Sequence, residues 1–165
     1  MRFHNITKDD MLNGDGLRTV LWLSGCTHAC LGCHNPITWD LKGGIPFDTN
    51  AKKELFETLK PDYIDGITLS GGDPFHPENR EDVYQLVKEI RNTFPNKTVW
   101  SYTGFLWEEI YHLSIIPLLD VIVDGKFIQA LLSPNQPWVG SSNQRVIDVQ
   151  TTLKQPDLTP VLWKS

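Results

Sequence analysis

Apolar residues follow two alternating patterns along this chain. Short uninterrupted apolar runs predict buried β-strands, and apolar residues spaced three or four positions apart predict amphipathic helices between them. The predicted strands are Leu17 to Leu23, Ile64 to Leu69, Lys97 to Tyr102 and Asp120 to Val123. Strands that alternate with helices form right-handed crossovers, and this favours a mostly parallel sheet with helices outside it.

Three helices are predicted from the second pattern. The first is capped by Asp48 or Thr49 and ends at Pro61, the longest runs from Glu78 to Phe94, and a shorter one opens at Thr103 and Gly104. We expect their buried faces to consist of Leu55, Phe56, Leu59, Val83, Leu86, Val87, Ile90, Phe94, Leu106, Ile110 and Leu113.

The fold class expected from these elements is α/β, with an open, partial (β/α) barrel. A complete eight-stranded barrel needs about 200 residues or more, which is longer than this chain of 165 residues. The length and the 40% content of hydrophobic residues fit one domain spanning residues 1–165. Residues 133–165 are richer in proline and are expected to be a C-terminal extension packed on that domain, with one more strand at Arg145 to Val149.

Composition and charge narrow the possible partners. The formal net charge of −5 gives no electrostatic reason to expect nucleic acid or an anionic membrane surface as a partner. The N-terminus lacks the apolar core of a signal peptide, and the longest apolar stretch is broken by Ser114, Pro117 and Asp120. We therefore expect a cytoplasmic protein.

All three cysteines lie close together, as Cys26, Cys30 and Cys33 directly after the first predicted strand. An odd number of closely spaced cysteines makes a poor disulfide framework, and free thiols are available to a metal. Three readings compete: a zinc site completed by His28 or His34, unligated buried or redox cysteines, and an iron-sulfur cluster with one iron lacking a protein ligand. The absence of a second ligand pair elsewhere in the chain favours the iron-sulfur cluster.

A second glycine-rich turn follows the second predicted strand, as Ser70-Gly71-Gly72-Asp73-Pro74. Glycines let backbone carbonyl groups approach a ligand closely, and a carboxylate suits an ammonium group. In a parallel sheet the carboxyl ends of the strands lie on one rim, where ligands gather. The cysteine loop, this turn, the turn at Thr103-Gly104 and the turn at Asp124-Gly125 are therefore predicted to surround one pocket.

The C-x3-C-x2-C spacing after an apolar strand, together with the glycine-acid turn, resembles the radical S-adenosylmethionine (radical SAM) enzymes. This resemblance implies a 4Fe-4S cluster on the three thiolates, with S-adenosylmethionine (SAM) chelating the fourth iron and yielding a 5'-deoxyadenosyl radical on reduction. The chemistry then belongs to the cofactors, and no catalytic acid or base is required. The cofactor-binding residues that it implies are Gly32, Cys33, His34, Ser70, Gly71, Gly72, Asp73, Ser101 and Thr103.

Further segments resemble the activating enzymes of glycyl-radical proteins. They are Asn13 to Arg18, Cys33 to Pro36 with Trp39, Trp100 to Gly104, Asp124 to Phe127 and Gly140 to Val146. The resemblance implies the large subunit of an anaerobic ribonucleotide reductase as the protein partner, and an electron donor such as flavodoxin.

Other functions remain open on the sequence. One is activation of a different glycyl-radical enzyme, and another is the activity of a 7-carboxy-7-deazaguanine synthase, which is also a small radical SAM enzyme. A non-enzymatic zinc-binding interaction module is the alternative from a different class. The Gly140 to Val146 segment favours the reductase activase among these.

Overall fold

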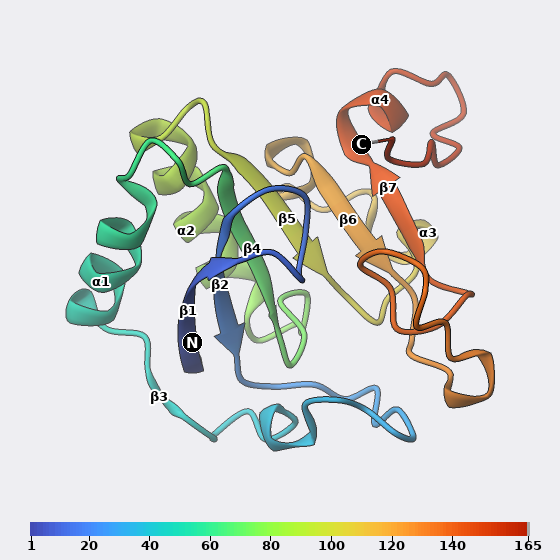
Figure 1. The fold of residues 1–165 in the computed structure, drawn as a ribbon, viewed down its shortest axis with the longest axis horizontal. Coiled ribbons are helices and arrows are strands. Elements are labelled where there is room, and N and C mark those ends of the chain that lie inside the picture. Colours follow the sequence, from blue (N-terminus) through green and yellow to red (C-terminus); the bar gives the residue numbers. More distant parts are fainter. Residues whose placement is uncertain (165) are drawn as a thin grey trace.

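A seven-stranded sheet runs through the centre of the protein, whose computed structural model describes residues 1–164 (Figure 1). The order of strands across it is β3-β1-β2-β4-β5-β6-β7. In chain order the strands are β1 Arg2–Asp10, β2 Arg18–Leu23, β3 Ile45–Pro46, β4 Gly66–Gly71, β5 Thr98–Tyr102, β6 Val121–Asp124 and β7 Arg145–Asp148.

The centre of this sheet is parallel and its edges are antiparallel. Strands β2, β4, β5 and β6 pair in parallel, whereas β1 pairs antiparallel with both β2 and β3, and β7 pairs antiparallel with β6. The sequence therefore predicted the parallel centre and the strand near Arg145 correctly, with boundaries shifted by up to two residues. It did not predict β1, because among the residues of that strand only Phe3 is buried and the apolar pattern is too sparse.

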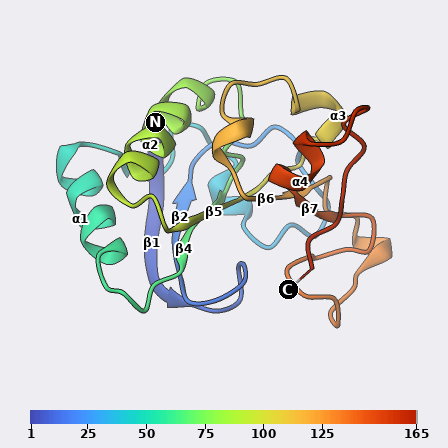
Figure 2. The ribbon, with the colours of Figure 1, turned by 90° about the horizontal axis from the view of Figure 1, so that it is seen from above.

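Helices cover one side of the sheet. They are α1 Thr49–Leu59, α2 Arg80–Thr93, α3 Trp107–Ile110 and α4 Val149–Leu153, and short 3-10 turns lie at Pro36–Thr38, Ile116–Leu118 and Gln129–Leu131. Figure 2 shows α1 and α2 on the same side of the curved sheet. The side chain of Asp48 caps α1 by accepting a hydrogen bond from the amide of Ala51, as the sequence predicted.

The third predicted helix is shorter than expected. It is a single turn, and Leu106, which was expected to be buried, is 44% exposed because it precedes the turn as its N-cap residue. The buried position is taken by Trp107, whose backbone N–H donates to the carboxylate of Asp124 at 2.8 Å. The side chain of Ile110 is buried, as predicted.

The pleat of the parallel strands separates two environments. Alternate residues point toward the helices and form the larger core, which includes Leu21, Leu23, Ile67, Leu69, Val99 and Ile122. A smaller cluster of Trp100, Val121 and Val123 packs against residues of the C-terminal segment, among them Trp138 and Trp163. The second face of the sheet is thus covered by loops and the C-terminal segment, and it keeps room for a cavity.

The C-terminal segment is attached by backbone pairing. Ile147 of β7 bridges to Leu162, and the amide of Trp163 donates to the carbonyl of Val146 at 2.8 Å. Within residues 1–164, no helix has the length and apolar character needed to cross a bilayer.

Arg18 ties the amino-terminal ends of the central strands together. Its guanidinium is buried and donates to the Thr68 hydroxyl, to the Thr98 hydroxyl and carbonyl, and to the carbonyl groups of Ile67 and Asp15, at 2.8 to 3.1 Å. Burial lowers the pKa of Arg18 to about 10, so the group is still charged at neutral pH. These donors are all used inside the protein, which gives Arg18 a structural role.

Replacing Arg18→Met is expected to lower the free energy of unfolding by roughly 3 kcal/mol or more, because buried carbonyl groups of β4 and β5 lose their partners. Urea denaturation measures this change. The exposed Lys53 on α1 provides the matched control, since Lys53→Met is expected to alter stability by less than about 0.5 kcal/mol. Equal effects of the two substitutions would contradict this account of Arg18.

Candidate cofactor site at the carboxyl ends of the strands

The cysteine loop leaves β2 in a fixed direction. The amide of Gly25 donates to the carbonyl of Thr38 at 2.7 Å, and the amide of Cys26 donates to the carbonyl of Trp39 at 3.0 Å. On the other side, the carbonyl of Gly25 accepts from the amide of Asp73 at 2.7 Å. The backbone of the first cysteine is therefore held between the end of the loop and the turn after β4.

The three cysteines are free thiols, and each is partly buried. The amide of Cys33 donates to the carbonyl of Cys30 at 3.1 Å, and the Sγ of Cys33 accepts from the amide of Asn35 at 3.4 Å. Burial raises the pKa of Cys26 to about 11. A thiol in this environment ionises readily only when a cation compensates the charge, as a metal ion does.

The donor set fits an iron-sulfur cluster by its chemistry. Three thiols without a disulfide partner lie in one loop, and a backbone N–H directed at the Cys33 sulfur is the kind of contact that stabilises a cluster ligand. In residues 1–164 no three His, Cys, Asp or Glu side chains converge closely enough to hold a metal ion. Two residues of the loop, Ala29 with φ of 48° and Gly32 with φ of 74°, bend it through the left-handed region.

The glycines after β4 make room for the neighbouring backbone. A Cβ atom on Gly71 would lie 2.4 Å from the amide nitrogen of Leu23, and one on Gly72 would lie 2.5 Å from the carbonyl oxygen of Gly25. Gly71 also has φ of 99°, which favours glycine. The sequence assigned these glycines to close approach of a ligand, which stays a prediction. The structure shows that Gly71 allows close approach of the end of β2 and that Gly72 allows close approach of the cysteine loop.

The carboxylate of Asp73 lies beneath the loop and is 1% exposed. It accepts hydrogen bonds from the ring Nε2–H of His28 at 2.6 Å, from the hydroxyl of Thr103 at 2.9 and 3.0 Å, and from the amide of Gly104 at 2.9 Å. Ser101 is fully buried and its hydroxyl donates to the carbonyl of Tyr102 at 3.3 Å. The side chains of Asp73, Ser101 and Thr103 thus have partners within the protein, and their predicted contact with SAM stays a prediction.

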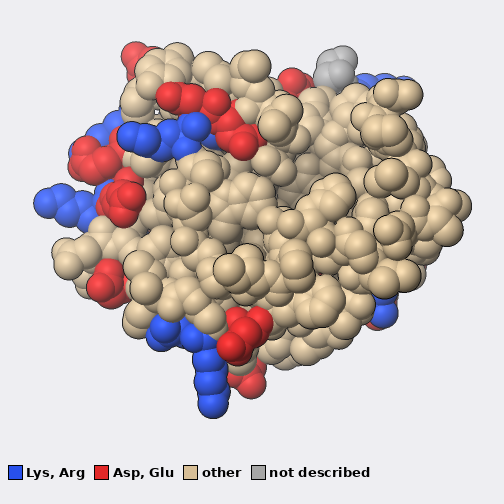
Figure 3. All heavy atoms as spheres, turned by 60° about the horizontal axis from the view of Figure 1, so that its bottom comes forward, with Lys and Arg blue, Asp and Glu red and all other residues tan. Residues whose placement is uncertain are grey.

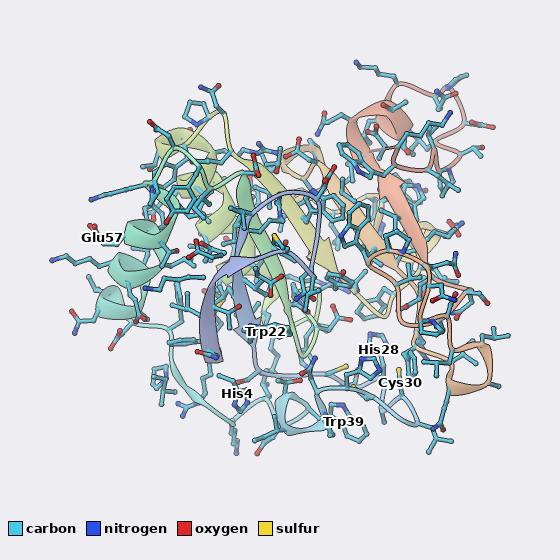
Figure 4. All side chains as sticks on the ribbon, in the orientation of Figure 1. His4, Trp22, His28, Cys30, Trp39 and Glu57 are labelled. Carbon is cyan, nitrogen blue, oxygen red and sulfur yellow. The ribbon has the colours of Figure 1, made fainter. Side chains whose placement is uncertain are left out.

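A cavity of about 410 Å³ opens on the second face of the sheet, beside the cysteine loop. This volume is within the usual range of small-molecule sites. Figure 4 shows Cys30 and His28 beyond the carboxyl ends of the strands, with Trp22 nearer the centre of the sheet. The cavity is lined by Leu12, Asn13, Trp22, His34, Asn35, Ser70, Tyr102, Phe127, Trp138, Val139, Gly140 and Gln144.

Two of the predicted cofactor-binding residues, His34 and Ser70, line this cavity. The ring of His34 packs against that of Phe127, with 5.2 Å between the ring centroids. Gly32 lies at the exposed end of the loop, beside the side chain of Gln129. The four predicted turns lie at one rim of the sheet, because hydrogen bonds link Gly72 to Leu23, Thr103 to Asp73 and Val123, and Gly125 to Phe105. The prediction that all four surround the pocket holds only in part, because Thr103-Gly104 and Asp124-Gly125 do not line the cavity.

Several cavity residues were missed from the sequence. Trp22 lies in the predicted strand Leu17 to Leu23 and was not proposed as a site residue, but it pairs in register with Ser70, so both side chains face the cavity from neighbouring strands. Alternation along β2 could have indicated this, because Leu21 and Leu23 on either side of Trp22 face the core. Tyr102 faces the same cavity and donates its hydroxyl to the carbonyl of Trp138 at 2.7 Å, and burial raises the pKa of Tyr102 well above its usual value.

The Gly140 to Val146 segment holds the loop after β6 against this cavity. The side chain of Gln144 accepts from the amides of Gly140 and Ser141 and donates to the carbonyl of Gly125 at 2.9 Å. Arg145 donates to the buried carboxylate of Asp124 at 2.6 Å, and this hydrogen bond raises the pKa of Arg145. These hydrogen bonds fix the loop after β6, which carries Phe127.

Comparisons with known proteins agree with an iron-sulfur site in this loop. A family model described as a 4Fe-4S single cluster domain matches residues 12–147. The anaerobic ribonucleoside-triphosphate reductase-activating protein of Enterobacteria phage T4 is 42% identical over 146 residues, covering 88% of this chain and 93% of the phage protein. The protein of the same name from Escherichia coli K12 is 41% identical over 150 residues, covering 88% of this chain and 97% of its own length.

A further relative with this name comes from Haemophilus influenzae, at 41% identity over 139 residues, 82% of this chain and 90% of that protein. The matched region includes the cysteine loop, the glycine turn after β4 and the loops around the cavity. The chain therefore belongs to the family of anaerobic ribonucleoside-triphosphate reductase-activating proteins.

Proposed function

We propose that this protein activates an anaerobic ribonucleoside-triphosphate reductase by generating a glycyl radical on its large subunit. The observation that carries the proposal is one loop with three free thiols, fixed at the carboxyl ends of parallel strands and bordering a cavity of ligand size. The family membership supports the same function. The electron is expected to come from a donor such as flavodoxin.

Cys26, Cys30 and Cys33 would hold the 4Fe-4S cluster. When bound, the cluster and SAM would supply the chemistry, which is one-electron reductive cleavage of the SAM sulfonium bond and abstraction of a hydrogen atom from the target glycine. The protein residues have the tasks of ligation, orientation and exclusion of water. No side chain needs to act as an acid or base.

The proposed SAM-binding site is the cavity beside the cysteine loop. His34 and Ser70 line it and are in a position to contact the bound molecule directly. Gly32 and Cys33 would border it from the loop, and Gly71, Gly72 and Asp73 would present backbone atoms. The buried side chains of Ser101, Thr103 and Asp73 would act indirectly, because their hydrogen bonds within the protein hold the ends of β4 and β5 in place.

The open side of the fold leaves room for a protein substrate. The parallel centre of the sheet, its helices on one side and its curvature support the assignment of residues 1–164 to one open, partial barrel of the radical SAM type (Figures 1 and 2). Because such a barrel is not closed, a loop of another protein has room to reach the cavity from the side. Docking of that protein would exclude solvent from the radical.

The surface at the carboxyl ends of the strands supports docking of the reductase there. Figure 3 shows that the charged side chains lie mainly toward one side and the margins of this face, and the remaining surface is uncharged. An apolar groove of about 470 Å³, lined by Leu31, Phe127, Ile128, Gln129 and Ala130, adjoins the cavity because Phe127 lines both. Leu31 and Leu132 are 79% and 56% exposed. We propose that this groove receives apolar side chains of the reductase next to the target glycine.

Each of the substitutions Cys26→Ser, Cys30→Ser and Cys33→Ser is expected to reduce the bound iron of the anaerobically reconstituted protein to below about a tenth of the wild-type content, and to abolish 5'-deoxyadenosine formation. The exposed Thr27 lies in the same loop, and Thr27→Ser should retain both. Iron analysis and chromatographic detection of 5'-deoxyadenosine measure the outcome. Stoichiometric zinc in place of iron, or a serine variant that retains its cluster, would contradict the proposed function.

The substitution Ile128→Asp is expected to raise the reductase concentration that gives half-maximal glycyl radical formation by about tenfold or more, because it places a charge in the docking groove. Formation of 5'-deoxyadenosine without the reductase should be unchanged. The matched control is Tyr63→Asp, since Tyr63 is 60% exposed near the amino-terminal end of β4. Electron paramagnetic resonance of the reductase measures the radical, and an equal effect of both variants would contradict docking at this groove.

A further inference from the structure

A buried hydrogen bond connects the cysteine loop to the ends of β4 and β5. The Nε2 atom of His28, between Cys26 and Cys30, lies 2.6 Å from the Oδ2 atom of Asp73. The two side chains are only 7% and 2% exposed. A buried hydrogen bond to a carboxylate is among the stronger protein hydrogen bonds, because water does not compete for either group.

The other partners of Asp73 leave this carboxylate little freedom. The hydroxyl of Thr103 donates to both of its oxygens, and the amides of Gly104 and Phe75 donate at 2.9 and 2.8 Å. The carboxylate is thus fixed by two turns that follow different strands. It offers His28 an acceptor whose position is set by the sheet.

The space around the His28 ring is equally restricted. A Cβ atom on Gly104 would lie 2.4 Å from the ring, so the ring occupies room that only glycine leaves. The ring of Phe105 packs edge-on against it, with 4.6 Å between the ring centroids. Because Nε2 is bonded to Asp73, that nitrogen is not available to a metal in this arrangement.

The backbone next to His28 needs such a restraint. Ala29, which follows it, has φ of 48°, a conformation that residues with a Cβ atom seldom adopt. In this loop the backbone amide of Cys26 donates a hydrogen bond to the carbonyl of Trp39, whereas the residues Thr27 and Ala29 are exposed. The side chain of His28 is therefore the buried anchor between the first two cysteines.

We propose that His28 is a positioning residue, whose hydrogen bond to Asp73 fixes the backbone between Cys26 and Cys30 and thereby sets where these two thiolates lie when they bind iron. The inference rests on the iron-sulfur part of the proposed function. It assigns the acid of the glycine turn to support of the cluster loop, in addition to any contact that the turn makes with SAM. Thr103 and Gly104 act in the same network by holding Asp73.

The test compares His28→Leu with His28→Gln in the reconstituted full chain, without SAM or reductase. The amide nitrogen of glutamine can replace Nε2 as a donor to Asp73, whereas leucine keeps an apolar side chain without a donor. We expect His28→Leu to lose its cluster to an iron chelator at least about tenfold faster than the wild type, which is the size of effect seen when contacts around a metal site are removed. We also expect a changed electron paramagnetic resonance spectrum of the reduced cluster. His28→Gln should restore both properties to near the wild type.

Thr103→Val provides a second variant outside the loop, with a smaller effect of the same sign. The exposed His112 gives the matched control His112→Leu, which should behave as the wild type. Thermal unfolding of the iron-free variants verifies that each is folded. Wild-type chelation rates and spectrum in a folded His28→Leu would overturn the proposal, as would failure of His28→Gln to restore them. Should His28→Leu not fold, an unaltered chelation rate in Thr103→Val would overturn it. A wild-type protein that binds no cluster would instead contradict the proposed function.

Discussion

The parallel pairing of β2 with β4, continued beyond the ends of both strands, is the constraint on which the site depends. Within the strands Trp22 pairs with Ser70, and beyond them the amides of Gly72 and Asp73 donate to the carbonyl groups of Leu23 and Gly25. The cysteine loop and the glycine turn are therefore joined backbone to backbone. This is possible only because Gly71 and Gly72 lack side chains that would occupy the space of the end of β2 and of the cysteine loop, respectively.

One face of the sheet contributes mainly to stability, and the other carries the candidate site. The helix-covered face holds the larger apolar core, and it needs no opening. The other face carries aromatic and polar side chains and is closed only in part, by the N-terminal loop and the C-terminal segment, so that a cavity is left at the carboxyl ends of the strands. A radical mechanism needs that cavity to be dry when the radical forms, and an uncharged surrounding surface suits closure by a protein partner.

Several of the segments that resemble the family form hydrogen bonds with one another. Gln144 and Arg145 bond to Gly125 and Asp124, and this places Phe127 against His34 of the cysteine loop. Asp73 performs the same task beneath the loop, where His28 and Thr103 meet it. In each case a polar side chain is buried and bonded, so its contribution is to fix a loop that has few apolar contacts of its own.

The sequence by itself determined the parallel centre of the sheet, the main helices and the common rim of four turns, because these follow from local apolar periodicity and from the direction of parallel strands. The cysteine spacing, through its resemblance to the radical SAM signature, likewise indicated the kind of cofactor. Only the tertiary structure decided which polar side chains face the cavity. Ser70 and His34 do, whereas Asp73 and Thr103 turn inward to partners far away in the sequence, which no local pattern encodes, and Ser101 turns inward to the carbonyl of the adjacent Tyr102. Strand β1 was also decided at this level, since its pairing with β2 compensates for its weak apolar pattern.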